Sequence, residues 1–141
     1  MVSLIAGSFG TIHPGHHKLI SAAVLLGDET EISIASDEYV SKYKKYFIPY
    51  EIRKQQIIDY IEQEFDSLFG FTISSFDSPF DGVDRTDIKT IVCSQETLMN
   101  VLAFNKLRSA RGLEEVNIYC IPLTLNDFGK KLSSTELIEN E

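Results

Sequence analysis

The sequence has few cysteines and no long apolar run. Its two cysteines, Cys93 and Cys120, form no CxxC pair, and no Cys/His spacing typical of a metal site is present. Both lie in apolar segments, which predicts buried, reduced thiols in a cytoplasmic protein. The longest apolar runs, such as 22–26, are far too short to cross a bilayer, and residues 1–6 have no basic leader typical of a signal peptide. We therefore expect neither a disulfide-stapled nor a membrane-embedded protein.

Cationic residues are also scarce, with 13 Lys and Arg against 21 Asp and Glu, which gives a net charge of −8. This charge disfavours a protein that coats DNA or RNA, although a small anionic ligand can still bind in a local basic pocket. The 141 residues contain no repeat, low-complexity tract or linker, and 43% of them are hydrophobic. This composition predicts one folded domain over residues 1–141.

Short Ile- and Val-rich segments alternate with helical patterns along the chain. The predicted strands are 2–6, 31–35, 71–76, 90–93 and 117–122, and the predicted helices are 14–26, 49–65, 97–111 and a short one from Ser133. Strands that are apolar on both faces are typical of parallel sheets covered on both sides. We therefore expect an α/β protein with a Rossmann-like, open, parallel five-stranded sheet and helices on both faces. The loop 77–87 is long enough to have a function.

Polar residues follow four of the predicted strands. They are Gly7 to His16 after the first strand, Lys42, Lys44 and Lys45 after the second, Ser94, Glu96 and Thr97 after the fourth, and Ser133, Ser134 and Thr135 after the fifth. In an open α/β sheet, ligands bind beyond the carboxyl ends of the strands. The sequence therefore predicts that these residues meet at one edge of the sheet and form an active site.

The segment after the first strand is the most informative. Gly7 and Gly10 allow the backbone to approach a ligand closely. Pro14 begins the next helix and is expected to leave amide groups pointing outward, as an anion site. His13 and His16 are three residues apart at this helix start, so both can face a phosphate. A single histidine here is more often a helix cap, but the glycines and the strand–loop–helix context favour a functional pair.

These residues resemble a known signature. Gly7-Ser8-Phe9 followed by His13-Pro14-Gly15-His16 resembles the HxGH signature of the nucleotidylyltransferase superfamily, and Leu132-Ser133-Ser134-Thr135 resembles its C-terminal element. Segments 91–97 and 103–108 are similar to the phosphopantetheine adenylyltransferases of archaea and eukaryotes. The resemblance implies the nucleotidylyltransferase fold and transfer of the adenylyl group of ATP to 4′-phosphopantetheine. The products are dephospho-CoA, on the route to coenzyme A, and pyrophosphate. Mg²⁺ is expected to accompany ATP, with no nucleic-acid or membrane partner.

The resemblance also implies roles for individual residues. His13, His16 and Lys42 are the expected catalytic residues, with Lys44 and Lys45 as alternatives to Lys42. The expected ATP contacts are Gly7, Ser8, Phe9, His16, Ser94, Glu96, Thr97, Ser133, Ser134 and Thr135. The expected acceptor contacts are Ser8, Lys42 and Asn105, and no protein side chain is expected to bind a metal.

Several alternatives remain open from the sequence alone. Ser133 and Glu136 fit a capping box, and Asn105 fits a buried, hydrogen-bonded core amide. Arg53 and Arg108 are possible phosphate partners, but arginines on helices are mostly solvated. The chain is expected to be a monomer.

The sequence also departs from the family pattern at two positions. Gly10 stands where the family often has Asp, and Ile138 stands where the SSTxxR element has Arg, with Lys130 or Lys131 as replacements. The alternative functions are another small nucleotidylyltransferase, which uses CTP or ATP with a different phosphorylated acceptor, and a nucleotide-binding module without turnover.

Overall fold

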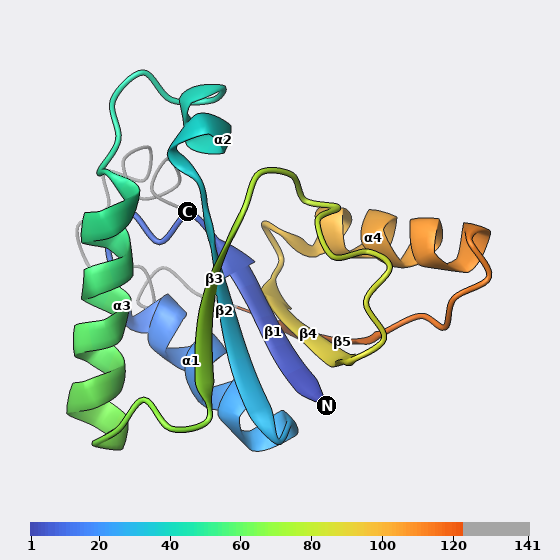
Figure 1. The fold of residues 1–141 in the computed structure, drawn as a ribbon, viewed down its shortest axis with the longest axis horizontal. Helices are drawn as coiled ribbons and strands as arrows, with labels where there is room; N and C mark the ends of the chain where they lie inside the picture. Colours follow the sequence, from blue (N-terminus) through green and yellow to red (C-terminus); the bar gives the residue numbers. More distant parts are fainter. Residues whose placement is uncertain (123–141) are drawn as a thin grey trace.

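The computed structural model describes residues 1–122, which form an open sheet flanked by helices (Figure 1). All strand pairs are parallel, in the order β3-β2-β1-β4-β5. The strands are β1 (Val2–Gly7), β2 (Glu29–Ala35), β3 (Phe71–Phe76), β4 (Ile88–Ser94) and β5 (Asn117–Ile121). The helices are α1 (Pro14–Leu26), α2 (Asp37–Ser41), α3 (Tyr50–Phe65) and α4 (Leu98–Ala110). The predicted Rossmann-like fold is confirmed, and the helix predicted from Ser133 lies outside the described residues.

The helix boundaries follow local signals in the sequence. Helix α1 begins at Pro14 and ends before Gly27, as predicted. Helix α3 begins at Tyr50, so Pro49 is its N-cap rather than part of its first turn. Helix α2 was not predicted, because five residues are too few to show a periodic pattern. At its start, the Ser36 hydroxyl accepts a hydrogen bond from the Tyr39 amide at 3.1 Å.

Each face of the sheet has its own apolar core. One core lies under α1 and α3 and is rich in isoleucine; its fully buried members include Ile5, Ile20, Ile32, Ile57 and Ile61. The other lies under α4 and includes Leu4, Ile91, Cys93, Val101 and Phe104. Leu4 and Ile5 therefore point to opposite faces of β1, as successive strand residues do. Burial of one such side chain stabilises the fold by roughly 1.5–3 kcal/mol, which explains why the central strands are apolar on both faces.

The connection from β3 to β4 is the loop 77–87, which runs across the α4 face of the sheet without forming a helix (Figure 1). Arg108, on α4, holds this loop: its Nη1 donates to the carbonyl oxygens of Val83 and Arg85, at 2.7 and 2.6 Å. The side chain of Arg108 is only 4% exposed. The prediction that Arg108 is solvated is therefore wrong, because backbone carbonyls replace its water.

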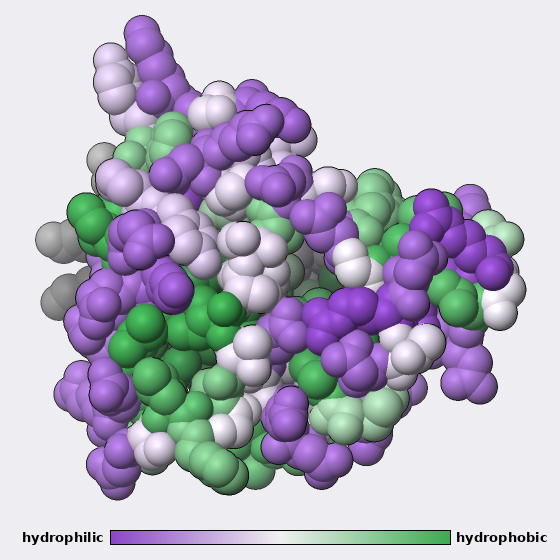
Figure 2. All heavy atoms as spheres, in the orientation of Figure 1, coloured by the Kyte–Doolittle hydropathy of each residue, from purple (hydrophilic) through white to green (hydrophobic). Residues whose placement is uncertain are grey.

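The surface seen in Figure 2 is mostly hydrophilic, as expected for a chain with so many acidic residues. An apolar area lies at the lower left, where α3 meets β3. Phe65 and Phe71 contact each other across this boundary, with ring centroids 5.3 Å apart. Within residues 1–122, no helix combines the length and the apolar character needed to span a membrane.

Candidate active site

The start of α1 holds the two histidines of the HxGH segment in a reciprocal arrangement. His13 is the N-cap, and its Nδ1 accepts a hydrogen bond from the Gly15 amide at 3.1 Å. The main-chain amide of His13 donates to Nδ1 of His16 at 3.3 Å. The two rings stack with centroids 3.8 Å apart, and both residues are buried. Because each Nδ1 accepts a hydrogen bond, the neutral form of each ring carries its proton on Nε2.

This arrangement corrects one expectation from the sequence. The first amide groups of α1 do not point outward as an anion site. The Gly15 amide donates to the His13 ring, and the amides of His16 and His17 donate to the His13 carbonyl at 2.9 and 3.2 Å. The reason is that the side chain and the carbonyl of His13, the N-cap residue, already accept hydrogen bonds from these amides. An anion at this helix start must therefore be met by imidazole groups and by the loop that precedes them.

That loop contains an unusual backbone conformation. Phe9 has a φ of 52°, which costs a residue with a side chain roughly 1–2 kcal/mol. Its ring is buried in the core at 1% exposure, with its centroid 5.0 Å from that of His16. A Cβ atom at Gly7 would come within 3.3 Å of this ring, so Gly7 leaves the space that Phe9 fills. The Phe9 side chain is therefore a core residue, and only its main chain is available for the predicted ATP contact.

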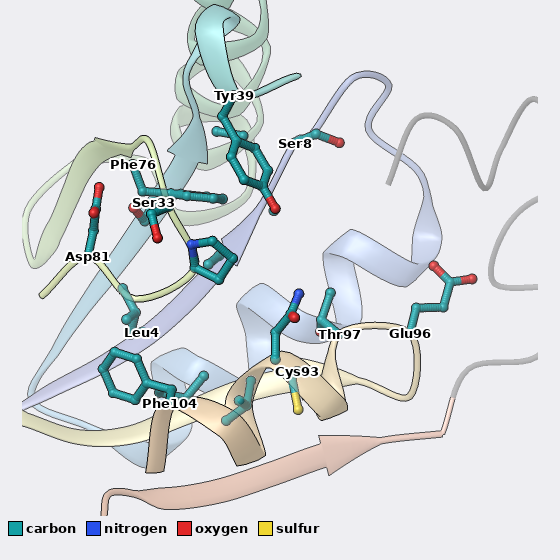
Figure 3. A pocket seen from close by; sticks show the side chains of 18 of the residues that line it. Leu4, Ser8, Ser33, Tyr39, Phe76, Asp81, Cys93, Glu96, Thr97 and Phe104 are labelled. Carbon is teal, nitrogen blue, oxygen red and sulfur yellow. The ribbon is translucent and has the colours of Figure 1, made fainter. Parts of the chain in front are cut away.

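A pocket of about 610 Å³ opens at the carboxyl edge of the sheet, between α2, α4 and the loop 77–87 (Figure 3). This volume is typical of a site for a small molecule. The Tyr39 hydroxyl points into the pocket from α2, opposite Thr97 and Phe104 on the α4 side. The walls combine aliphatic and aromatic side chains with a few polar ones, among them Ser8, Ser33, Lys44, Ser78, Thr97 and Asn100.

The pocket brings together some of the predicted site residues. Gly7, Ser8, Glu96 and Thr97 line it, although they come from two separate strand–helix connections. His13 and His16 do not line the pocket. They lie at the start of α1, which follows Gly7 and Ser8 in the chain. Ser94 is buried at the end of β4, and its carbonyl accepts the Thr97 amide at 3.2 Å.

The assignment of Lys42 is not supported by its position. Lys42 is the C-cap residue of α2, is exposed and does not line the pocket. Lys44, one of the two alternatives, does line it. Lys45 lies over the ring of Tyr46 instead, 5.6 Å from its centroid. The sequence could not distinguish these lysines because the main chain after α2 follows no regular periodicity.

The position of Asn105 does not support the predicted substrate contact either. Its side-chain amide donates to the Val116 carbonyl at 2.9 Å, and its side-chain oxygen accepts from the Val116 amide at 2.8 Å. Asn105 is 5% exposed and does not line the pocket. It is the buried, hydrogen-bonded asparagine of the alternative interpretation, and it ties α4 to the start of β5.

Sequence reasoning missed several polar residues of the pocket, among them Asn100 and Tyr39. Asn100 lines the pocket together with Thr97, Val101 and Phe104. Counted from Thr97, the N-cap of α4, the other three follow after three, four and seven residues. This is the spacing of one helix face, and it could have identified Asn100 from the sequence. Tyr39 lies on the unpredicted α2. Its ring contacts those of Tyr43 and Phe76 with centroids 5.2 and 5.4 Å away. Burial, followed by the contact with Tyr43, raises the pKa of Tyr39, so its hydroxyl stays protonated at neutral pH.

The cysteines remain free thiols, and Cys93 contributes to the pocket wall. Burial and the neighbouring Cys120 raise the pKa of Cys93 to about 12. The Cys93 thiol is therefore neutral at physiological pH and acts as an apolar surface rather than as a nucleophile. In residues 1–122, no three His, Cys, Asp or Glu side chains meet as metal ligands. Ser133, Ser134, Thr135, Lys130, Lys131 and Ile138 lie outside the described residues.

Comparison with known proteins identifies the family. A model of the cytidylyltransferase-like family matches residues 4–140, nearly the whole chain. The phosphopantetheine adenylyltransferase of Pyrobaculum aerophilum is 31% identical, over 94% of this chain and 86% of the relative. The chain belongs to the cytidylyltransferase-like family. The family resemblance seen in the sequence is therefore confirmed.

Other relatives agree with this membership. The bifunctional phosphopantetheine adenylyltransferase/NTP phosphatase of Thermoplasma acidophilum is 32% identical over the full chain, which spans 43% of that relative's length. A crystal structure of an Archaeoglobus fulgidus protein of unknown function superimposes with a TM-score of 0.80 at 24% identity, covering 94% of this chain and 96% of that one. At this identity the superposition supports the fold alone.

Proposed function

We propose that the chain transfers the adenylyl group of ATP to 4′-phosphopantetheine, giving dephospho-CoA and pyrophosphate. The observation that carries this proposal is the buried, stacked pair of His13 and His16 at the carboxyl edge of β1, beside a pocket reached by Ser8 and Lys44. Family membership supports it, because relatives that the chain covers almost completely are named phosphopantetheine adenylyltransferases.

The chemistry needs positioning and charge neutralisation rather than a protein nucleophile. The phosphate of the acceptor attacks the α-phosphorus of ATP in line, and pyrophosphate leaves. His13 and His16 donate from Nε2 to phosphate oxygens, where negative charge grows in the transition state. Lys44 supplies a positive charge from the other side of the pocket. The stacked rings suit this role because their Nδ1 atoms are already occupied by backbone amides.

The pocket fits the acceptor that the family uses. A pantetheine arm is a flexible chain with two amide groups and a small apolar end, so it needs apolar walls with scattered polar groups. Leu4, Ile91 and Phe104 supply apolar walls, while Tyr39 and Asn100 supply hydrogen-bonding groups. Ser8 lies at the upper end of this pocket in Figure 3, and His13 follows it five residues later in the chain. This position supports Ser8 as a contact of the acceptor phosphate.

We propose that Mg²⁺ enters with ATP as part of the substrate. The triphosphate supplies oxygen ligands of the kind that Mg²⁺ prefers, and the ion offsets its charge. We also propose that the protein is cytoplasmic and acts as a monomer on these two small molecules.

The test is a product assay. The protein is incubated with MgATP or MgCTP and 4′-phosphopantetheine, pyrophosphate release is followed, and the product is identified by mass. Dephospho-CoA formed with ATP but not with CTP is the expected result. Turnover with CTP alone, or with ATP and another phosphorylated acceptor only, would identify a different nucleotidylyltransferase. Saturable ATP binding without turnover would identify a binding module.

A further inference from the structure

The two buried arginines of the described chain, Arg53 and Arg108, hold different parts of the molecule. Arg108 fastens the loop 77–87, whereas Arg53 reaches from α3 to the carboxyl edge of the sheet. The Arg53 side chain is 1% exposed, although it carries a charge. Burial of a guanidinium is expensive unless nearly all its N–H groups are hydrogen-bonded, so its contacts show what it is placed to hold.

Arg53 binds the loop that precedes the histidines. Its Nη1 donates to the carbonyl oxygens of Ser8 and Ala35, at 2.8 and 2.7 Å. These two carbonyls lie just beyond β1 and at the end of β2. The next residue after Ser8 is Phe9, whose positive φ persists only where its surroundings fix it. Two contacts therefore hold the turn at residues 8 and 9: Arg53 binds the Ser8 carbonyl, and the Phe9 ring is buried in the core.

Arg53 also brackets the segment that carries Lys44. Its Nη2 donates to Oδ1 of Asp37 at 2.9 Å, and its Nε donates to the Ile48 carbonyl at 2.7 Å. Asp37 lies before Lys44 in the chain and Ile48 lies after it. Asp37 Oδ1 also accepts the Tyr50 amide at 2.8 Å, so the same carboxylate joins the start of α2 to the start of α3.

We infer that Arg53 is a positioning residue for adenylyl transfer: one buried guanidinium sets the Ser8–Gly10 loop and the Lys44 segment at a fixed separation. Arg53 acts through these two segments rather than by contacting the phosphates itself. The inference rests on the proposed function for its effect on turnover, but its effect on the loop is a property of the free protein.

Arg53→Lys and Arg108→Lys form a matched pair, because each removes one buried guanidinium and leaves a positive charge. At a temperature where both variants are folded, Arg53→Lys is expected to lower kcat at least about tenfold, since small misplacements of reacting groups are costly. Arg108→Lys is expected to keep kcat within about threefold of the wild type, with any effect on the KM for the acceptor, because the loop that Arg108 holds is a wall of the pocket. If Arg53→Lys does not fold, Asp37→Asn weakens the same connection and keeps the three carbonyl contacts.

A double-mutant cycle separates positioning from general destabilisation. Lys44→Ala is expected to lower kcat much more in the wild-type background than in Arg53→Lys, because the displaced lysine contributes little there. Equal fold-changes in the two backgrounds, or equal kcat values for Arg53→Lys and Arg108→Lys, would overturn the inference.

Hydrogen exchange of the free protein tests the same inference without any substrate. Backbone amides of residues 8–10 are expected to exchange faster in Arg53→Lys than in the wild type, and to be unchanged in Arg108→Lys. Unchanged exchange in Arg53→Lys would overturn the positioning role. If the wild type instead shows no adenylyl transfer while this exchange difference is present, the proposed function fails and the structural role of Arg53 stands.

Discussion

The ring of His13 and the ring of His16 lie face to face, 3.8 Å apart, and each accepts a backbone amide through Nδ1. The pair is thus at once a helix cap and a double donor of Nε2–H groups. The two interpretations that the sequence left open, cap and phosphate ligand, are compatible because they use different nitrogen atoms of the same ring.

Substitutions that preserve the cap separate these two roles. Asn is a good N-cap residue and Gln a good third residue of a capping box, so His13→Asn and His16→Gln are expected to fold normally. Each is expected to lower kcat by about 10²–10³, as for loss of a hydrogen-bond donor to the charge that develops in the transition state. The measurement is steady-state turnover together with thermal unfolding.

The control for this prediction is the neighbouring histidine. His17 stacks on Tyr60 of α3, with ring centroids 4.2 Å apart, so its ring packs against α3. His17→Gln is expected to retain wild-type kcat. A variant of His13 or His16 with near-normal turnover would remove that residue from the mechanism.

The lysine assignment is open to direct comparison. Lys44 lines the pocket and Lys42 does not, so Lys44→Ala is expected to lower kcat by about 10–100-fold while Lys42→Ala changes it little. Initial rates at saturating ATP and acceptor measure the difference. The reverse order of effects would restore the assignment made from the sequence.

Asn105 is expected to matter for stability rather than for catalysis. Asn105→Ala leaves the buried amide and carbonyl of Val116 without their partners, which is expected to cost about 2–3 kcal/mol of unfolding free energy. Denaturant unfolding measures this loss, with kcat unchanged below the transition. Asn100→Ala is the matched variant: an exposed pocket residue that is expected to raise KM for the acceptor at unchanged stability. A large KM effect from Asn105→Ala at normal stability would contradict this division.

The lowered pKa of His17 predicts how the free energy of unfolding depends on pH. Burial, followed by the nearby His16, lowers the pKa of His17 below its usual value of 6.5, while Glu64 opposes the shift. The unfolded chain therefore takes up this proton at a higher pH than the folded chain does. Stability from this source is present above about pH 6.5 and falls as the pH drops toward the lower folded-state pKa. Urea unfolding between pH 5 and pH 7 measures this effect. The unfolding free energy of His17→Gln is expected to change less with pH than that of the wild type. An equal pH dependence in the two proteins would contradict the contribution of His17.

Much of the fold was predictable because its signals are local and repeated. The four Ile- and Val-rich segments and the weakly alternating segment 71–76 all form strands, and Pro14 and Gly27 mark the ends of α1 as expected. The five-residue α2 was not predictable, since its only signal is the cap provided by Ser36.

The site was predictable only in part, because its contacts depend on distant segments. The arrangement of His13 and His16 is encoded within four residues, so the sequence could indicate it. The choice of Lys44 over Lys42 and the burial of Arg53 depend on how α2 and α3 pack against the β1 loop. Arg53 and Arg108 also look like surface residues in sequence, since only the folded backbone supplies the carbonyl groups that accept their hydrogen bonds.

The central place of β1 has a consequence for the chain as it is synthesised. Val2 pairs with Glu29 on one side and with Ile88 on the other, so β1 is completed by a strand that comes after both β2 and β3 in the chain. Until β4 has left the ribosome, β1 exposes an unpaired edge next to apolar side chains such as Leu4. An exposed apolar edge invites pairing with other chains. Synthesis intermediates that stop before Ser94 are therefore expected to be the most aggregation-prone forms of this protein.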